Sequence, residues 1–378
     1  MTEPSASLRL VVGCMTGTSI DAIDCALVKI EGHGLELKAS LVRASSQPLG
    51  ALRAPLRAIA EQKPVNAGEI AKIAMEFGVL HADAIGRLLG SEHANLVCVH
   101  GQTVFHGPPT SWQLMNPWPI VQAIRAPVVF DLRGADLASG GQGAPITPLA
   151  DQILLAGHAG LEHGCCVVNL GGFANATLLA GGKGRDGSVR GFDICVCNQL
   201  LDRIARETMG CEFDKDGREA ANGQVDARAA KELAQSLSDS SGKTRSLGTG
   251  DEYFSWLELQ RTRLPAWDLA ATACDAIASV IAVRCSGSGP MLLAGGGSRN
   301  RTLFAAIRKQ AAVAGIPSVH LSDEFGLSSE FREAMEFAVL GALCQDRVPI
   351  TLPGVTGVRE PAPISGAWAG VGFQPVRE

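Results

Sequence analysis

Two strand–turn–strand units, one in each half of the chain, constrain the fold more than any other feature of the sequence. In residues 8–30 an apolar, β-branched run is broken by a polar turn at 16–19, which predicts two paired strands. The pattern returns where residues 165–170 lead into Gly171-Gly172 and residues 174–179 lead away. Because both units place small residues in the turn, they indicate an internal duplication and a fold of two similar halves.

The remaining segments mix strands with helices. Apolar residues at helical spacing predict a helix over residues 66–89. Further helices are expected at 302–314 and 329–344, buried strands at 94–99 and 127–130, and further strands at 37–44 and 290–294. Strands and helices in this order predict an α/β fold.

The length of the chain predicts two domains. It has 378 residues, and domains average roughly 150 residues. The densest cluster of glycine and proline, at 139–145, is a natural boundary. We therefore predict an N-terminal domain over residues 1–143, rejoined by the C-terminal segment 354–378, and a C-terminal domain over residues 144–353.

Composition and charge exclude several classes of protein. The net charge of -5 and the dispersed lysines and arginines argue against nucleic acid and anionic membranes as partners. The apolar stretch 264–283 contains Asp268 and Asp275, so we expect a core helix and not a membrane span. The start of the chain, Met1-Thr2-Glu3-Pro4, lacks the positive region of a signal peptide. Eleven scattered cysteines fit a reducing compartment, and we expect a cytoplasmic protein.

Three glycine-rich turns follow predicted strands, at 16–19, at Gly171-Gly172 and at Gly295-Gly296-Gly297. Successive backbone N–H groups in such turns can bind an anion, and glycine allows a close approach. The same turns are also common in ordinary hairpins, so the residues alone leave both interpretations open. The chain lacks the P-loop pattern G-x-x-x-x-G-K-[ST].

A few polar residues are candidates for chemistry. Asp21 and Asp24 follow the first turn, where they are either Mg²⁺ ligands or ordinary turn residues. Asp193 enters an apolar, strand-like run, and a lone carboxylate there is either hydrogen-bonded or functional. His100 and His106 have no partner histidine at a helical metal spacing, so they are loop hydrogen-bonding residues or substrate contacts.

Taken in order, the motifs resemble the anhydro-N-acetylmuramic acid kinase family. Met15-Thr16-Gly17-Thr18-Ser19-Ile20-Asp21-Ala22-Ile23-Asp24 is similar to the family's M-S-G-T-S-x-D-G-x-D, and His100-Gly101-Gln102-Thr103-Val104-Phe105-His106 is similar to its G-H-G-Q-T-x-x-H loop. The matches continue with Asp131-Leu132-Arg133, Gly140-Gly141-Gln142-Gly143-Ala144-Pro145, Asn169-Leu170-Gly171-Gly172-Phe173-Ala174-Asn175, Gly191-Phe192-Asp193, Gly295-Gly296-Gly297 and Glu333-Ala334-Met335-Glu336-Phe337-Ala338.

The resemblance implies a fold and a role for each matching residue. The fold is the sugar kinase/Hsp70/actin superfold, in which two ribonuclease-H-like halves bind ATP in a cleft. It implies that Asp193 is the catalytic base, that Glu333 is a carboxylate contacting the sugar, and that Asp21 is the Mg²⁺ ligand. The ATP-binding residues would be Gly17, Thr18, Ser19, Ile20, Asp21, Ala22, Ile23 and Asp24, then Gly171 and Gly172, then Gly295, Gly296 and Gly297. The sugar contacts would be His100, Gln102, Thr103, Arg133, Gln142 and Asn175.

The family reaction uses ATP and Mg²⁺ to open a 1,6-anhydro amino sugar with water and to phosphorylate O6, in peptidoglycan recycling. The resemblance also implies a homodimer. Two departures keep alternatives open. Met115 replaces a family glycine near the sugar region, which favours another anhydro sugar such as levoglucosan. Ile194-Cys195-Val196-Cys197 replaces a family loop of the type T-G-P-G, which favours a catalytically weak paralogue that binds nucleotide or muropeptides.

Overall fold

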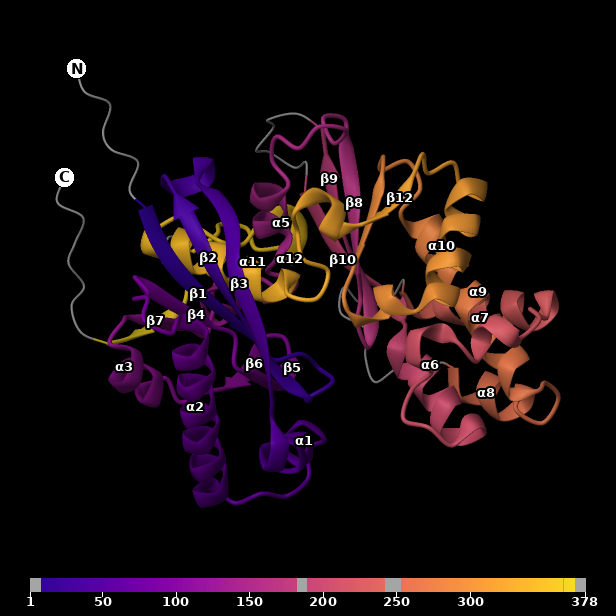
Figure 1. Ribbon diagram of the computed structural model, residues 1–378, viewed down its shortest axis with the longest axis horizontal. Coiled ribbons are helices and arrows are strands. Elements are labelled where there is room, and N and C mark those ends of the chain that lie inside the picture. Colours follow the sequence, from indigo (N-terminus) through magenta and orange to yellow (C-terminus); the bar gives the residue numbers. More distant parts are fainter. Residues whose placement is uncertain (1–7, 182–188, 242–252, 363, 371–378) are drawn as a thin grey trace. The chain divides into compact units, whose positions relative to one another are not determined.

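The structure is a computed structural model that describes residues 8–181, 189–241, 253–362 and 364–370. The chain divides into two compact units (Figure 1). Unit 1 contains residues 1–156 and 331–378, and unit 2 contains residues 157–330.

These boundaries differ from the predicted domains 1–143 with 354–378 and 144–353. Helices α5 (Pro148–Leu154) and α11 (Arg332–Gln345) both belong to unit 1. Arg332 of α11 donates hydrogen bonds of 2.9 and 2.6 Å to the two carboxylate oxygens of Asp151 in α5. Both side chains are buried, so this pair and the packing around it keep α5 and α11 in one unit, and a glycine-rich segment does not mark the boundary.

The sheet of unit 1 has six strands in the order β13-β7-β4-β1-β2-β3. Its strands are β1 (Leu8–Met15), β2 (Ala22–Glu31), β3 (Lys38–Pro48), β4 (Leu96–Val99), β7 (Val128–Phe130) and β13 (Ala367–Ala369). The pairs β1–β2 and β2–β3 are antiparallel, and β1–β4 and β4–β7 are parallel. The predicted first strand–turn–strand unit is therefore confirmed, with Met15 opposite Asp24.

Two long helices pack on opposite faces of this sheet. Helix α2 (Ala67–Leu89) begins with a capping box between Asn66 and Glu69 and contributes Phe77 to the same core as Val12 of β1. Because side chains alternate along a strand, the neighbouring Gly13 faces the other way. A Cβ at Gly13 would collide with the backbone of α11 at Ala334. Glycine here lets α11, and with it Glu333, approach the sheet closely.

Shorter elements complete unit 1. A two-stranded hairpin, β5 (Gln102–Gly107) and β6 (Thr110–Leu114), follows β4 directly. The short helices are α1 (Arg53–Ala60), α3 (Trp118–Ile124), α4 (Gly134–Ala138) and α12 (Pro353–Thr356).

Unit 2 repeats the strand order of unit 1, because its sheet runs β10-β9-β8-β11-β12. Strands β8 (Gly164–Leu170), β9 (Phe173–Ala180) and β10 (Val189–Val196) are antiparallel neighbours, and β11 (Met291–Ala294) and β12 (Val319–Leu321) continue the sheet in parallel. Three antiparallel strands followed by parallel ones form the core of both units. This confirms the predicted duplication and the fold class of two ribonuclease-H-like halves.

Helices cover the sheet of unit 2: α6 (Asn198–Ile204), α7 (Ala227–Ser241), α8 (Phe254–Gln260), α9 (Ala266–Arg284) and α10 (Arg301–Val313). By length and composition α9 is apolar enough to span a membrane, but 67% of that apolar stretch is buried inside the protein. The core helix predicted over 264–283 is confirmed.

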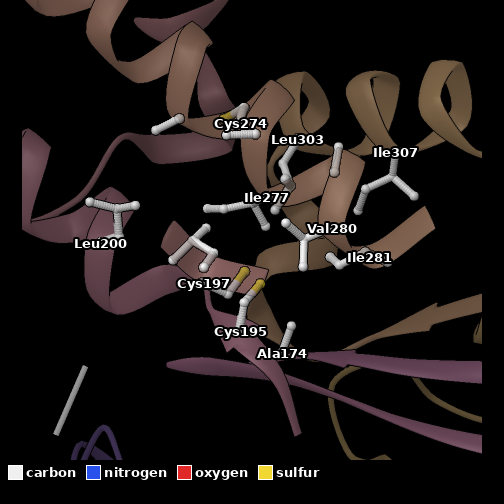
Figure 2. Packing of buried hydrophobic residues seen from close by; sticks show 14 of the residues in the cluster. Ala174, Cys195, Cys197, Leu200, Cys274, Ile277, Val280, Ile281, Leu303 and Ile307 are labelled. Atoms are coloured by element: carbon white, nitrogen blue, oxygen red, sulfur yellow. The ribbon is translucent and has the colours of Figure 1, made fainter. Parts of the chain in front are cut away.

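The residues after Asp193 are part of the core of unit 2. Ile194, Cys195 and Val196 end strand β10, and all three side chains are fully buried together with Cys197. In Figure 2, Cys195 and Cys197 lie beside Ile277 and Val280 of α9. The segment that replaces the family's T-G-P-G loop is therefore strand and core, and its apolar side chains are explained by packing.

Candidate active site

The turn between β1 and β2 combines an exposed carboxylate with an open glycine. Asp21 is exposed, and its Oδ1 accepts hydrogen bonds from the Ser19 hydroxyl at 2.7 Å and the Ala22 amide at 2.9 Å. Ile20 has a positive φ of 52°, which a β-branched residue adopts only when its surroundings hold it there. A Cβ at Gly17 would come no closer than 3.7 Å to the Ser19 hydroxyl. Packing does not require this glycine, and the space above it suits a ligand.

Asp21 fits Mg²⁺ only as a nucleotide-bound ion. Among the described residues no group of three or more His, Cys, Asp or Glu is placed to hold a metal. Mg²⁺ keeps several waters and needs only one or two protein carboxylates when phosphates supply other ligands. Asp21, with Oδ1 oriented by two donors, matches that requirement. Asp24 lies three residues further along, within β2.

In unit 1 the buried His100 pairs with the partly buried Arg133. His100 follows β4, and its Nδ1–H donates to the Gly101 carbonyl at 2.9 Å. Its Nε2 therefore accepts from Arg133, with Nη2 at 3.0 Å and Nε at 3.2 Å. Burial, together with the positive charge of Arg133, lowers the pKa of His100 to about 3. The ring is neutral at physiological pH, and its tautomer is fixed.

The loop after α4 holds the same arginine from the other side. Arg133 Nη1 donates to the Gly143 carbonyl at 2.7 Å. The Gly143 amide in turn donates to buried Asp136 at 2.7 Å, and Asp136 also accepts from the Thr356 hydroxyl at 2.8 Å. Gln142 lies in this loop with an exposed side chain. Two neutral acceptors thus orient a guanidinium, which suits recognition of an anionic group.

Glu333 lies close to this pair. Glu333 lies in the first turn of α11, one turn before Phe337, whose ring centroid is 4.9 Å from that of His100. Residues four apart share one helix face, so Glu333 is on the side of His100. Burial raises the pKa of Glu333, and the charges of Arg332 and Arg133 oppose that rise. The structure therefore brings His100, Arg133 and Glu333 together.

Behind Glu333 lies a buried ionic cluster. Besides its two bonds to Asp151, Arg332 has its Nε 2.7 Å from Glu336 Oε1. All three side chains are almost fully buried. Burial and the neighbouring Asp151 raise the pKa of Glu336 well above its usual value. The raised pKa favours the neutral form of Glu336, in which Arg332 and Asp151 remain as an ion pair.

In unit 2 a row of polar residues crosses three strands. Asn169 of β8 is opposite Asn175 of β9, which is opposite Asp193 of β10. A β-bulge follows Asp193, because Cys195, and not Ile194, pairs with Ala174. Bulges redirect side chains and are frequent near active sites. The structure thus brings the predicted Asp193 and Asn175 together, and Asp193 is only half-buried.

The turn Gly171-Gly172 is fixed by the segment that begins α6. The Gly172 carbonyl accepts from the Cys197 amide at 2.8 Å, and the Gly171 carbonyl accepts from the Asn198 amide at 3.0 Å. The Asn198 side chain also donates to the Leu170 carbonyl at 3.1 Å. Cys197 therefore holds the turn through its backbone amide alone, independently of its side chain, whereas Asn198 uses both its amide and its side chain.

The three glycines after β11 have different roles. Gly295 has φ +82°, and a Cβ there would lie 2.5 Å from Asn169 Oδ1. A Cβ at Gly297 would lie 2.8 Å from both Asn198 Oδ1 and the Leu170 side chain. At Gly296, which is exposed, a Cβ would meet no atom of the described residues within 4 Å. Packing requires Gly295 and Gly297, whereas Gly296 leaves open space.

This difference gives a test of the adenosine assignment. We expect Gly296→Val to raise the ATP KM at least about tenfold, which corresponds to about 1.4 kcal/mol, because the new side chain fills the space beside the turn. Circular dichroism and the melting temperature should not change. Gly297→Val is the matched control, and it should lower the melting temperature. Unchanged ATP binding in Gly296→Val would contradict the assignment.

Some functional candidates carried no clear signal in the sequence. Asn198, Asp136 and Arg332 each fix a predicted site segment, but all three do so through partners distant along the chain. The sequence signal that could have found Asp136 and Asn198 is their closeness to the family motifs Asp131-Leu132-Arg133 and Gly191-Phe192-Asp193. Gln102 and Thr103 were expected in a loop after the strand over 94–99, but they begin strand β5. The Gln102 amide donates to the Thr103 carbonyl at 3.2 Å.

The strand order and the turn between the first two strands of each unit define the sugar kinase/Hsp70/actin class of proteins. The chain matches the family "Anhydro-N-acetylmuramic acid kinase" over residues 9–369. A relative with that name from Gloeobacter violaceus is 33% identical, covering 94% of this chain and 97% of the relative. One from Bordetella parapertussis is 35% identical, covering 93% of each. The chain therefore belongs to the anhydro-N-acetylmuramic acid kinase family, and it is an enzyme.

Among solved structures, component A of the (R)-2-hydroxyglutaryl-CoA dehydratase from Acidaminococcus fermentans is similar. It is 11% identical, with a TM-score of 0.46, and the match covers 88% of this chain and 98% of that one.

Proposed function

We propose that this protein is an ATP-dependent kinase that opens 1,6-anhydro-N-acetylmuramic acid with water and phosphorylates O6. The observation that carries the proposal is the placement of Asp193, which lies opposite Asn175 immediately before a β-bulge, in a chain that matches the kinase family almost throughout. The product is N-acetylmuramic acid 6-phosphate, in the cytoplasmic recycling of peptidoglycan by a homodimer.

Asp193 acts as the base. The oxygen of a water molecule forms a bond to C1 of the sugar while the C1–O6 bond breaks, and the water proton passes to the Asp193 carboxylate. O6, released from the ring, attacks the γ-phosphate, and ADP leaves. A carboxylate within hydrogen-bond reach of the water contributes roughly 10²–10⁴-fold to such a step. Asn175, opposite Asp193 in the sheet, donates a hydrogen bond to the sugar or the water.

Unit 1 binds the sugar. Arg133 pairs with the carboxylate of the muramic acid lactyl group, because its guanidinium is oriented by the neutral acceptors His100 Nε2 and Gly143 O. Glu333, close to this pair, accepts a hydrogen bond from the sugar. The remaining contacts come from the hairpin and from the loop after α4, through Gln102, Thr103 and Gln142.

The nucleotide is bound by the three glycine turns. Residues 17–24 and Gly171-Gly172 surround the phosphates, and Gly295-Gly296-Gly297 lies against the adenosine. Asp21 would hold Mg²⁺, which supplies positive charge against the phosphates. The backbone of these turns adds N–H donors without any rearrangement during the reaction.

A second substrate has one observation in its favour. Gly101 has φ +78°, and a Cβ there would lie 3.2 Å from the Cβ of Met115. Met115 thus lies beside Gly101, the neighbour of His100. A methionine there is bulkier than the family's glycine and reduces the space available to a sugar substituent. A smaller anhydro sugar such as levoglucosan fits that change.

One assay tests these proposals together. ADP release is measured with purified protein, ATP and Mg²⁺ on 1,6-anhydro-N-acetylmuramic acid, 1,6-anhydro-N-acetylglucosamine and levoglucosan. We expect the muramic acid to give the highest kcat/KM, and Arg133→Met to lose that preference over the glucosamine. Highest turnover of levoglucosan would support the second substrate. No turnover of any sugar, with intact ATP binding, would contradict both and favour a binding protein.

A further inference from the structure

The hairpin β5–β6 has one polar face whose hydrogen bonds form a chain. Gln113 Nε2 donates to the Ser111 hydroxyl at 2.8 Å and to the Thr103 hydroxyl at 3.3 Å. The Ser111 hydroxyl donates to the Phe105 carbonyl at 3.2 Å and lies 2.9 Å from His106 Nδ1. Thr103 is opposite Gln113, and His106 is opposite Ser111, across the two strands.

The protons in this chain can be assigned. A carbonyl only accepts, so the single hydroxyl proton of Ser111 goes to the Phe105 carbonyl. His106 must then donate its Nδ1–H to Ser111, and in the neutral ring Nε2 carries a lone pair. Burial and the nearby Arg133 charge lower the pKa of His106, which keeps the ring neutral. His106 Nε2 is therefore a hydrogen-bond acceptor.

The same reasoning applies to Gln113. Its amide has two hydrogens, and both are donated, one to Ser111 and one to Thr103. The carbonyl oxygen Oε1 is thus fixed on the opposite side of the amide group as an acceptor. A flipped amide would place Oε1 against the Ser111 hydroxyl, whose proton already goes to Phe105.

Both acceptors are buried and have no partner among the described residues, namely His106 Nε2 and Gln113 Oε1. Gln113 as a whole is 8% exposed. A buried polar atom without a hydrogen bond costs about 1–3 kcal/mol, and such atoms in native proteins require an explanation such as a ligand or a water. Two acceptors fixed on one face, near the charge of Arg133, suit a ligand that offers N–H or O–H donors.

We propose that His106 and Gln113 determine substrate specificity, by accepting hydrogen bonds from the two neutral donors of the sugar. This inference rests on the proposed function. In 1,6-anhydro-N-acetylmuramic acid the oxygens at C1, C3 and C6 carry no hydrogen, and the lactyl carboxylate is ionised at neutral pH. The remaining donors are the acetamido N–H at C2 and the hydroxyl at C4. Two acceptors on the protein thus meet two donors on the substrate.

Ser111 is a positioning residue in this scheme. It touches no substrate, but it receives the Nδ1–H of His106 and so keeps the lone pair on Nε2. Without the Ser111 hydroxyl the ring can adopt the other tautomer, in which Nε2 carries the hydrogen. Nε2 is then a donor itself and cannot accept a hydrogen bond from the sugar.

The test is a double-mutant cycle between protein and substrate. We compare three variants with the wild type: Gln113→Met, His106→Phe and Ser111→Ala. Each is assayed on the parent sugar, on its 4-deoxy analogue, and on the analogue with an acetoxy group in place of the acetamido group. On the parent sugar we expect each variant to lose roughly five- to 150-fold in kcat/KM, mostly through KM. On the analogue that lacks the recognised donor, the loss should shrink to less than about threefold.

Controls separate the possible outcomes. Trp112→Phe changes the exposed opposite face of the same hairpin and should leave all three sugars unaffected. Melting temperatures show whether each variant folds, and if His106→Phe does not, Ser111→Ala and Gln113→Met still complete the cycle. Equal losses on all three sugars, or no loss on any, would overturn the proposal and assign the acceptors to bound water. Failure of the wild type to turn over the parent sugar would instead overturn the proposed function.

Discussion

Replacement of Asp193 by Asn is expected to lower kcat at least about 10²-fold, the lower end of what a general base contributes, with little change in the Kd for ATP. The reason is local. Asn has the shape of Asp and can still pair with Asn175 across β9 and β10, where the two residues are opposite each other. It lacks only the capacity to take a proton from water.

Pre-steady-state measurements of ADP release and equilibrium titration with ATP check this expectation. Asp83→Asn, on the exposed face of α2, is the matched control and should behave as the wild type does. If Asp193→Asn retains near-normal turnover, another group is the base. If ATP binding is lost as well, Asp193 acts on the nucleotide and not on the water.

The sequence predicted the two halves well, because the signals there are local. The run before Thr16 and the run after Asp21 are apolar and β-branched, and a strand pair separated by a polar turn has few alternatives. The helix over 66–89 was equally clear, since its apolar spacing and the cap at Asn66 agree. Periodicity alone predicted the start of this helix within one residue, and the capping box at Asn66 explains why the helix begins there.

The sequence did not predict where the units divide or how the residues after Asp193 fold. The division depends on Arg332 and Asp151, which are 181 residues apart in the chain, and no local pattern reports such a pair. Residues 194–197 resemble a substituted loop only by comparison with the family motif. Their own β-branched and cysteine side chains are those of a buried strand, which is what the structure contains.

The candidate site shows the same limit at single residues. Sequence reasoning treated Gly295, Gly296 and Gly297 as one ligand-binding turn. Packing separates them, because two of these glycines are needed for contacts with β8 and its neighbours and the third leaves open space. The acceptors His106 Nε2 and Gln113 Oε1 could not be predicted from the sequence either, because the direction of each hydrogen bond depends on the whole network and not on residue type.

The largest loss of stability is expected at Arg332. Arg332→Met leaves the Asp151 carboxylate buried without its cation, and removal of one member of a buried ion pair typically costs about 3–5 kcal/mol. Urea unfolding monitored by circular dichroism measures the change. Arg299→Met, which breaks the exposed pair with Glu330, is the matched control and should cost no more than about 1 kcal/mol. Equal losses in the free energy of unfolding for the two variants would show that the buried cluster contributes no more to stability than an exposed ion pair does.

Glu336→Gln tests the protonation state within the same cluster. Burial and Asp151 raise the pKa of Glu336 well above its usual value, so we expect glutamine to replace a carboxyl that is neutral over a wider pH range than usual. A carboxyl with a raised pKa in the folded state adds stability that is complete below the ordinary value and is lost as the pH rises through the folded value. As the pH rises from 4.5 to the folded pKa, the free energy of unfolding of the wild type should therefore fall relative to that of Glu336→Gln. At acidic pH the two free energies of unfolding should differ by less than about 1 kcal/mol. A wild type that gains on the variant as the pH rises would mean that Glu336 is ionised, and that Arg332 neutralises two carboxylates instead of one.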